Sequence, residues 1–307
     1  MRIVFLGNPE FARFHLETIV EEGFNVVGVV SAMDKPAGRG LKLRGTPVAE
    51  YAREKNIPLL QPKNLKNEEF LKELANLKAD IQIVIAFRML PEVVWNMPPL
   101  GTLNLHASLL PQYRGAAPIN WAIINGEQHT GVTTFKLKHE IDTGDILLQE
   151  SCDISSDDTA GSLHDKLMHL GAQVTVKTLN GIIAGNLKEQ PQKTVDNIIS
   201  APKLFTENTK IDFSQKANQI RNFVRGLCPY PVAHMQLNGL RLRVFEVDYE
   251  LISHKHSPAT IVSDSKNYLK VACEDGFVIL KDVQLQGKKR MGIEDFLRGY
   301  KGKLGND

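Results

Sequence analysis

The sequence contains few of the residues that mark specialised classes of protein. Only three of its 307 residues are cysteine. They form no Cys-x-x-Cys pair, and their odd number does not support a disulfide framework, so we expect a reducing compartment. Aromatic residues make up only 7% of the chain, which predicts few platforms on which exposed bases could stack. No stretch approaches the roughly 20 apolar residues that span a bilayer, so no membrane partner is expected.

Acidic and basic residues are also nearly balanced in number. The net charge is +2, and the hydrophobic share of 42% is ordinary for a globular protein. From Leu204 onward there are 16 basic and 12 acidic residues, which leaves 21 and 23 for the first 203. A mildly basic C-terminal third is compatible with a polyanionic partner. The apolar run at 2–6 is too short for a signal peptide, so we expect a cytoplasmic protein.

The first part of the chain alternates short apolar runs with segments of helical periodicity. Apolar runs at 2–6 and 25–30 flank a helical stretch at 9–22, with Pro9 in the first turn. This alternation predicts an α/β fold, a mainly parallel, Rossmann-like sheet with helices on both faces. Further strands are expected at 79–86, 102–106, 131–138 and 146–153, and helices at 67–77, 117–124 and 159–184.

The character of the sequence changes after Gly185. Residues 186–203 are polar and have no sustained period, so we expect a first domain at 1–187, a linker at 188–203 and a second domain at 204–307. After a helix at 214–225, short strands are expected near 240–247, 259–262, 269–272 and 276–280. Short strands separated by Gly, Asp and Asn favour a small, OB-like β-barrel.

One strand ends with two polar side chains that could carry chemistry. Asn104 and His106 are two residues apart, so they point to the same face of the expected strand. Ligands of open α/β sheets bind at the carboxyl ends of the strands. An amide beside an imidazole could there stabilise an oxyanion and transfer a proton. An arbitrary pair of this kind would more often only cap local backbone groups.

Two neighbouring loops favour the catalytic interpretation. Residues 111–118, Pro-Gln-Tyr-Arg-Gly-Ala-Ala-Pro, are too rich in proline and glycine for a regular element. Residues 140–146, Glu-Ile-Asp-Thr-Gly-Asp-Ile, place a carboxylate beside a glycine turn. An Asp142 that reached His106 would fix the tautomer of the imidazole and stabilise the imidazolium.

Together these motifs resemble those of the formyltransferases that use 10-formyltetrahydrofolate. The resemblance covers nearly the whole chain and is carried by Asn-x-His, by Ser-Leu-Leu-Pro-x-Tyr-Arg-Gly-Ala-Ala-Pro at 108–118 and by Asp-Thr-Gly-Asp-Ile at 142–146. Phe-Leu-Gly-Asn-Pro-Glu-Phe-Ala at 5–12, Pro-Ala-Gly-Arg-Gly at 36–40 and Gly-Lys-Lys-Arg-Met at 287–291 are similar to the branch that formylates methionyl-tRNA. Residues 86–91 depart from the family pattern, because this loop is shorter and contains Arg88.

The resemblance implies a substrate pair and a set of site residues. It implies 10-formyltetrahydrofolate as co-substrate, initiator methionyl-tRNA as partner and a tRNA-binding role for the C-terminal barrel. We expect a monomer, and we expect no metal because the histidines show no close ligand pairing apart from His254 and His256. The catalytic residues of the family fall on Asn104, His106 and Asp142, and the turn that borders the folate falls on Ser108, Leu109, Leu110 and Pro111. The candidates for tRNA contact are Arg39, Lys42 and Arg44 in one loop and Lys288, Lys289 and Arg290 in the second domain.

Other chemistries find less support among the residues. No cysteine or serine lies in a nucleophile motif such as Gly-x-Ser-x-Gly, which favours direct attack by the amine. Gly7-Asn8-Pro9 is not the Gly-x-Gly-x-x-Gly cradle of a nicotinamide enzyme. His254 and His256 lie in a polar segment and are expected at the surface rather than at a zinc ion.

Several related functions remain open from the sequence alone. A formyltransferase for an amino-sugar nucleotide would share the three catalytic residues, and Asn120-Trp121 is similar to that branch. A glycinamide ribonucleotide formyltransferase would normally lack the second domain. A hydrolase that releases formate would not need a polyanion-binding extension. An RNA-binding protein without activity could use the same scaffold, but would not need Asn104, His106 and Asp142 together.

Overall fold

The computed structural model describes residues 1–37 and 42–304, and the chain forms two compact units. The first unit comprises residues 1–114, 131–152 and 166–199. The second comprises residues 115–130, 153–165 and 200–307. The units therefore interleave along the chain, and the sequential division at 188–203 stays a prediction.

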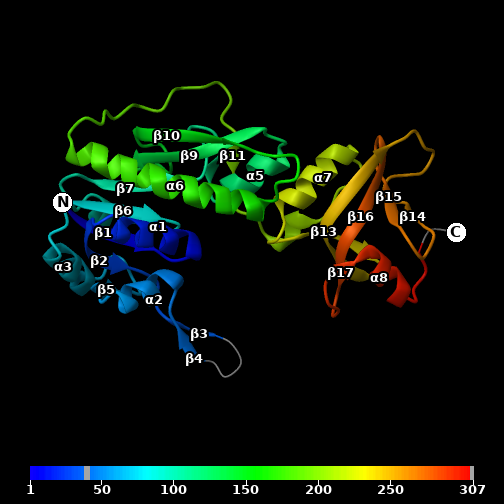
Figure 1. The fold of residues 1–307 in the computed structure, drawn as a ribbon, viewed down its shortest axis with the longest axis horizontal. Coiled ribbons are helices and arrows are strands. Elements are labelled where there is room, and N and C mark those ends of the chain that lie inside the picture. Colours follow the sequence, from blue (N-terminus) through cyan, green and yellow to red (C-terminus); the bar gives the residue numbers. More distant parts are fainter. Residues whose placement is uncertain (38–41, 305–307) are drawn as a thin grey trace. The chain divides into compact units, whose positions relative to one another are not determined.

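A seven-stranded sheet forms the centre of the first unit (Figure 1). Its strands, in spatial order, are β10 (Ile146–Asp153), β9 (His129–Lys136), β7 (Thr102–His106), β6 (Ile81–Ile85), β1 (Arg2–Gly7), β2 (Asn25–Val30) and β5 (Leu59–Leu60). The pairs from β7 through β6, β1 and β2 to β5 are parallel, whereas β9 pairs with β7 in the antiparallel direction. The predicted Rossmann-like, mainly parallel sheet is confirmed.

Helices cover both faces of this sheet. Helices α3 (Glu68–Asn76) and α4 (Glu92–Trp95) pack on one face, in a core formed by Val4, Leu6, Val30, Leu65, Phe70, Leu74, Val84, Leu90 and Val94. Helices α1 (Glu10–Glu21) and α6 (Ala160–Ile183) lie on the other face. Gly171 of α6 lies against Leu105 and His15, and a Cβ there would come within 2.6 Å of the leucine side chain.

Polar side chains join the ends of β1 and β2 to the next segment. Asn8 accepts a hydrogen bond from the Ala32 amide at 2.8 Å, and Ser31 donates to the Gly7 carbonyl at 2.9 Å. A short hairpin, β3 (Lys35–Ala37) and β4 (Lys42–Arg44), follows before α2 (Pro47–Glu54). Arg39, between the two hairpin strands, lies outside the described residues.

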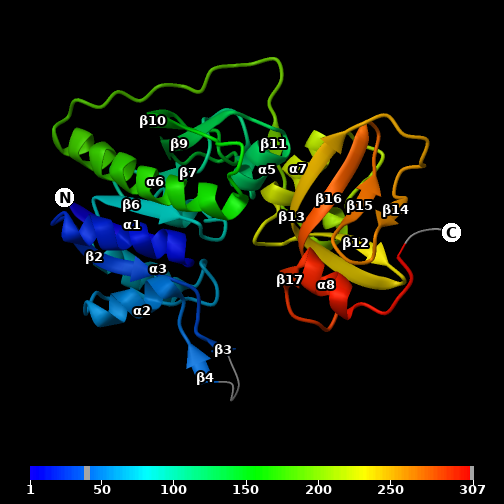
Figure 2. The ribbon, with the colours of Figure 1, turned by 45° about the vertical axis from the view of Figure 1, so that its right-hand side comes forward.

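The second unit contains a six-stranded antiparallel sheet (Figure 2). Its order is β12 (Ala233–Leu237), β13 (Leu240–Leu251), β16 (Gly276–Leu285), β15 (Leu269–Ala272) and β14 (Ile261–Ser263), with β17 (Met291–Gly292) beside β16. The helical elements of this unit outside α6 are α5 (Pro118–Ile124), η1 (Thr206–Thr209), α7 (Ala217–Gly226) and α8 (Ile293–Gly299). The sheet curls like half of a barrel, consistent with the expected small barrel.

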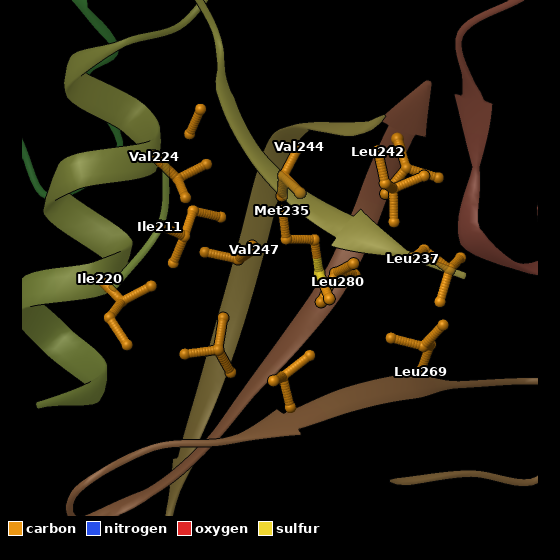
Figure 3. Close-up of a cluster of buried hydrophobic side chains, with 14 of the residues drawn as sticks. Ile211, Ile220, Val224, Met235, Leu237, Leu242, Val244, Val247, Leu269 and Leu280 are labelled. Atoms are coloured by element: carbon orange, nitrogen blue, oxygen red, sulfur yellow. The ribbon is translucent and has the colours of Figure 1, made fainter. Parts of the chain in front are cut away.

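Apolar side chains from both the sheet and α7 form the core of the second unit (Figure 3). Ile220 and Val224 of α7 face Val244 and Val247 of β13, and all four are less than one tenth exposed. Burial of an aliphatic side chain contributes roughly 1.5–3 kcal/mol, so this cluster is a major source of stability for the unit. No helix in the described part of the chain is long and apolar enough to cross a membrane.

Candidate active site

The carboxyl end of β7 carries the two polar side chains singled out in the sequence. Asn104 is half-buried and His106 is 8% exposed, and their spacing places both on one face of the sheet. Among the described residues, the Asn104 side chain has no hydrogen-bond partner. Its amide N–H groups are therefore available to a ligand at this strand end.

The His106 ring is held by the backbone of the following loop. Nε2 lies 2.8 Å from the carbonyl oxygen of Tyr113. A carbonyl oxygen can only accept, so Nε2 carries the hydrogen and Nδ1 is the nitrogen that gains or loses a proton. Nδ1 lies 3.9 Å from Oδ2 of Asp142, and both side chains are about nine tenths buried. The structure thus brings the carboxylate to the Nδ1 side of the imidazole.

The loop that carries Asp142 has an unusual backbone. Asp142 has a φ of +55°, in the left-handed region that non-glycine residues rarely adopt. Gly144 cannot be replaced without movement, because a Cβ would overlap the Lys136 carbonyl oxygen. The Thr143 hydroxyl donates to the Glu140 carbonyl at 3.0 Å. These constraints fix the direction in which the Asp142 side chain leaves the loop.

A buried hydroxyl supports the turn at 108–111. Thr133 Oγ1 donates to the Ser108 carbonyl at 2.6 Å and accepts from the Leu110 amide at 3.1 Å. Gln149 Nε2 donates to the Leu110 carbonyl and to Thr133 Oγ1, each at 2.9 Å. Ser108 is fully buried and the Leu110–Pro111 peptide is cis. Leu109 and Pro111 are partly exposed, so they are the members of the turn that a ligand could contact.

The departure from the family pattern at 86–91 has a local explanation. Arg88 donates to the carbonyl oxygens of Pro62 and Lys63, at 2.5 and 3.0 Å. Leu90 is buried in the core of the sheet face, whereas Met89 is 74% exposed. Arg88 therefore attaches this loop to the segment that follows β5.

The basic run of the second unit divides into two kinds of residue. Lys288 and Lys289 are exposed. Arg290 instead forms an ion pair with Asp282, with Nε 3.0 Å from each carboxylate oxygen, and its guanidinium lies 4.1 Å from the Phe245 ring centroid. In the other candidate loop, Arg44 is exposed and lies 3.3 Å from Glu50. Lys42 belongs to β4, and Arg39 is outside the described residues.

Sequence reasoning missed a basic hollow in the second unit. The hollow has a volume of about 460 Å³ and is lined by Gln236, Gly239, Arg241, Arg243, Gln284, Leu285, Gln286 and Gly287. The signal was present as the alternation Arg-Leu-Arg at 241–243, in which Leu242 is buried and the arginines point to the other face of β13. Cationic and amide side chains at this place could bind phosphate oxygens.

The histidine pair considered for zinc has structural contacts. His254 Nε2 lies 2.9 Å from the Gly276 carbonyl and 3.1 Å from the Cys273 carbonyl. The rings of His254 and His256 also pack against Phe277. In residues 1–37 and 42–304 there is no group of three or more His, Cys, Asp or Glu residues placed to hold a metal ion. The expectation that no metal takes part stays a prediction.

Comparison with protein families covers both units. Residues 1–179 match the family described as formyl transferase, and residues 203–301 match the formyl transferase C-terminal domain. The chain is 50% identical over 308 residues to the methionyl-tRNA formyltransferase of Bacteroides fragilis strain YCH46, covering 98% of this chain and 95% of that protein. It is 48% identical over 309 residues to the protein of that name from Bacteroides thetaiotaomicron, covering 98% and 96%.

Solved structures share the fold at lower identity. An N-formyltransferase from Helicobacter canadensis, in complex with folinic acid and dTDP-3-aminofucose, superposes with a TM-score of 0.69 at 22% identity, covering 92% of this chain and 98% of that one. A phosphoribosylglycinamide formyltransferase from Bacillus halodurans superposes with a TM-score of 0.51 at 20% identity, covering 60% and 96%.

Proposed function

This chain belongs to the formyl transferase family, and from that premise we propose that it formylates the amino group of initiator methionyl-tRNA with 10-formyltetrahydrofolate. The main support is sequence identity of 48–50%, over 98% of this chain, to proteins named methionyl-tRNA formyltransferase. The enzyme is then a one-carbon transferase whose product, N-formylmethionyl-tRNA, serves translation initiation. We place it in the cytoplasm as a monomer that needs no metal.

The residues at the end of β7 supply the groups that this reaction requires. The amine nitrogen of methionine attacks the formyl carbon, and a tetrahedral oxyanion forms. The Asn104 amide donates to that oxyanion as its charge develops. The C–N bond to the folate then breaks, and the proton lost by the amine is transferred to the folate nitrogen. No covalent enzyme intermediate is needed.

His106 and Asp142 provide the path for that proton. Nε2 of His106 is engaged by Tyr113, so the proton passes through Nδ1. Asp142, 3.9 Å away, stabilises the imidazolium that forms for part of each turnover. Catalytic contacts are often longer in the absence of substrate than in the transition state, so this distance is compatible with the role.

We assign the folate to the turn at 108–111 and the tRNA to basic residues in both units. Leu109 and Pro111 present apolar surface, while the buried Ser108 and Leu110 fix their position. The residues proposed to contact tRNA are Arg39, Lys42, Arg44, Lys288 and Lys289, with Arg241 and Arg243 of the basic hollow in addition. Arg290, the remaining basic residue of this run, is already engaged by Asp282 and contributes less. Phosphate contacts of this kind make affinity dependent on salt.

The direct test is a formylation assay with two amine acceptors. The purified chain is incubated with 10-formyltetrahydrofolate and either methionyl-tRNA or an amino-sugar nucleotide, and the loss of free amine is measured. Formylation of methionyl-tRNA alone is the expected outcome. Formylation of the sugar nucleotide alone would contradict the proposal, and release of formate without acceptor would indicate a hydrolase. Binding of tRNA without turnover would indicate an RNA-binding protein.

A further inference from the structure

The segment expected to be a linker lies along the candidate active site of the first unit. Gln190 and Ile146 exchange backbone hydrogen bonds, with N–O distances of 2.7 and 2.9 Å. Beside them, Lys136 and Glu189 form an ion pair at 2.6 Å. The segment thus adds a short antiparallel bridge to the start of β10, directly after the loop that carries Asp142.

The side chain of Gln192 extends from this segment into that loop. Its Nε2 donates to the Asp142 carbonyl at 2.8 Å and to the Gly144 carbonyl at 2.9 Å. Its Oε1 accepts from Nε and Nη2 of Arg114, at 3.2 and 2.6 Å. A primary amide has two N–H donors and an oxygen with two lone pairs, so all of its hydrogen-bonding capacity is used. One side chain therefore connects the loop at 142–144 with the loop at 111–118.

The backbone at Asp142 needs such support. A left-handed φ at a non-glycine residue is strained and persists only where surrounding contacts determine it. Gln192 bonds to the carbonyl of that same residue and to that of Gly144, two residues later. The peptide planes on the C-terminal side of Asp142 are consequently oriented by the glutamine amide.

We infer that Gln192 is a positioning residue for formyl transfer, which holds the Asp142 carboxylate toward Nδ1 of His106. The inference rests on the proposed function, because it uses the role assigned to Asp142. The hydrogen bonds of the glutamine go to two backbone carbonyls and to Arg114, so its effect on the rate passes through the backbone of the loop. Misplacement of a catalytic group by about 1 Å can lower a rate by about 10²-fold.

Gln192→Ala should lower the single-turnover rate at saturating substrates by roughly 10- to 100-fold. The KM values for the folate and for tRNA should change little. Gln192→Glu retains an acceptor for Arg114 but places a carboxylate against two carbonyl oxygens, so it should be as slow as the alanine variant. Gln190→Ala is the matched control, because residue 190 contacts Ile146 through its backbone.

A double-mutant cycle separates positioning from general damage to the fold. In an Asp142→Asn background the catalytic carboxylate is already lost. Adding Gln192→Ala should therefore lower the single-turnover rate by less than about a further 3-fold. Equal losses in both backgrounds, or a Gln192→Glu variant as fast as the parent, would overturn the inference.

A second readout does not depend on activity. Amide hydrogen exchange at 142–146, followed by mass spectrometry, should be faster in Gln192→Ala than in the parent and unchanged in Gln190→Ala. If the parent itself formylates neither acceptor, the proposed function fails, whereas the exchange result still tests the support of the loop. Unchanged exchange together with an unchanged rate would remove Gln192 from the site.

Discussion

His106 donates a hydrogen bond from Nε2 to the backbone carbonyl of Tyr113, seven residues later in the chain, at 2.8 Å. This contact leaves only Nδ1 to exchange a proton, and Nδ1 faces Asp142. The loop at 111–118, which contains the two-residue strand β8 (Arg114–Gly115), thereby determines which nitrogen of the histidine carries the hydrogen.

Replacement of Asp142 by asparagine should remove the charge that stabilises the imidazolium while preserving the size of the side chain. We expect the fold to persist and the single-turnover rate to fall by about 10²-fold or more. Glu140→Gln changes an exposed carboxylate in the same loop and serves as the control. A rate near that of the parent for Asp142→Asn would remove this carboxylate from the mechanism.

Asn104→Ala should remove a hydrogen-bond donor that acts mainly on the oxyanion. Loss of one such donor lowers the rate by ~10²–10³-fold. Folate affinity, measured by equilibrium dialysis, should stay close to that of the parent because the contact forms in the transition state. Asn104→Asp is nearly isosteric but has no N–H donor, so it should be equally slow. A fast aspartate variant would contradict the assigned role.

Thr133→Val should destabilise the turn at 108–111. The fully buried Thr133 hydroxyl donates to the Ser108 carbonyl and accepts from the Leu110 amide. Valine has no hydroxyl, so both backbone groups lose this hydrogen bond. An unsatisfied buried polar group costs about 1–3 kcal/mol, which should appear in the free energy of unfolding by urea. Folate binding should weaken as well, whereas Thr133→Ser should restore both. Weaker stability with unchanged folate affinity would separate the turn from the folate site.

The sequence predicted the regular elements of the first unit well where the local pattern was strong. The strands at 25–30, 102–106 and 146–153 have the predicted bounds, and the helix expected at 9–22 is α1. The two-residue strand β5 and helix α2 were not predicted. A strand as short as Leu59–Leu60 has no period to detect, and it forms because the neighbouring β2 offers backbone partners.

The supports of the candidate site could not be predicted from local patterns. Asn104 and His106 are linked by strand periodicity, so their common face follows from the sequence. Thr133 and Gln192 act on loops about 25 and 50 residues away, through contacts that only the tertiary fold creates. The polar composition of 186–203 indicated a linker. The backbone pairing of Gln190 with Ile146 could not be foreseen, because a single bridge leaves no pattern in a short polar segment.

The second unit should lose stability in mild acid because of His234. Burial lowers the pKa of this histidine below its ordinary value, and the positive charges of Arg241, Lys210 and Arg243 lower the pKa further. The unfolded chain then binds a proton near pH 6.5 that the folded chain does not, so stability is full above that pH and declines as the pH falls below it. One such proton gives a slope of at most about 1.4 kcal/mol per pH unit.

The measurement for His234 is the difference in unfolding free energy between the parent and His234→Gln, in urea at pH 7.5 and at pH 5.5. The difference should change in favour of the variant at the lower pH, since glutamine has no proton to gain. Groups that titrate equally in both proteins cancel in this comparison. A difference that is the same at both pH values would show that His234 does not couple folding to pH in this range.

The last prediction concerns the basic run at 288–290, whose members differ in what already engages them. Lys288 and Lys289 are exposed, so each can contact a phosphate without breaking an existing interaction. Arg290 is engaged by Asp282 and by the face of Phe245, so a phosphate would have to compete with both. Lys289→Ala should therefore reduce the slope of log affinity for tRNA against log salt by about one unit. Arg290→Ala should change that slope less and instead lower the free energy of unfolding by roughly 1 kcal/mol, through loss of the ring contact and the ion pair.

Filter binding across a salt series and urea unfolding of the two variants distinguish these outcomes. A full unit of slope lost with Arg290→Ala, at unchanged stability, would mean that tRNA displaces Asp282 and that this arginine is a phosphate contact after all.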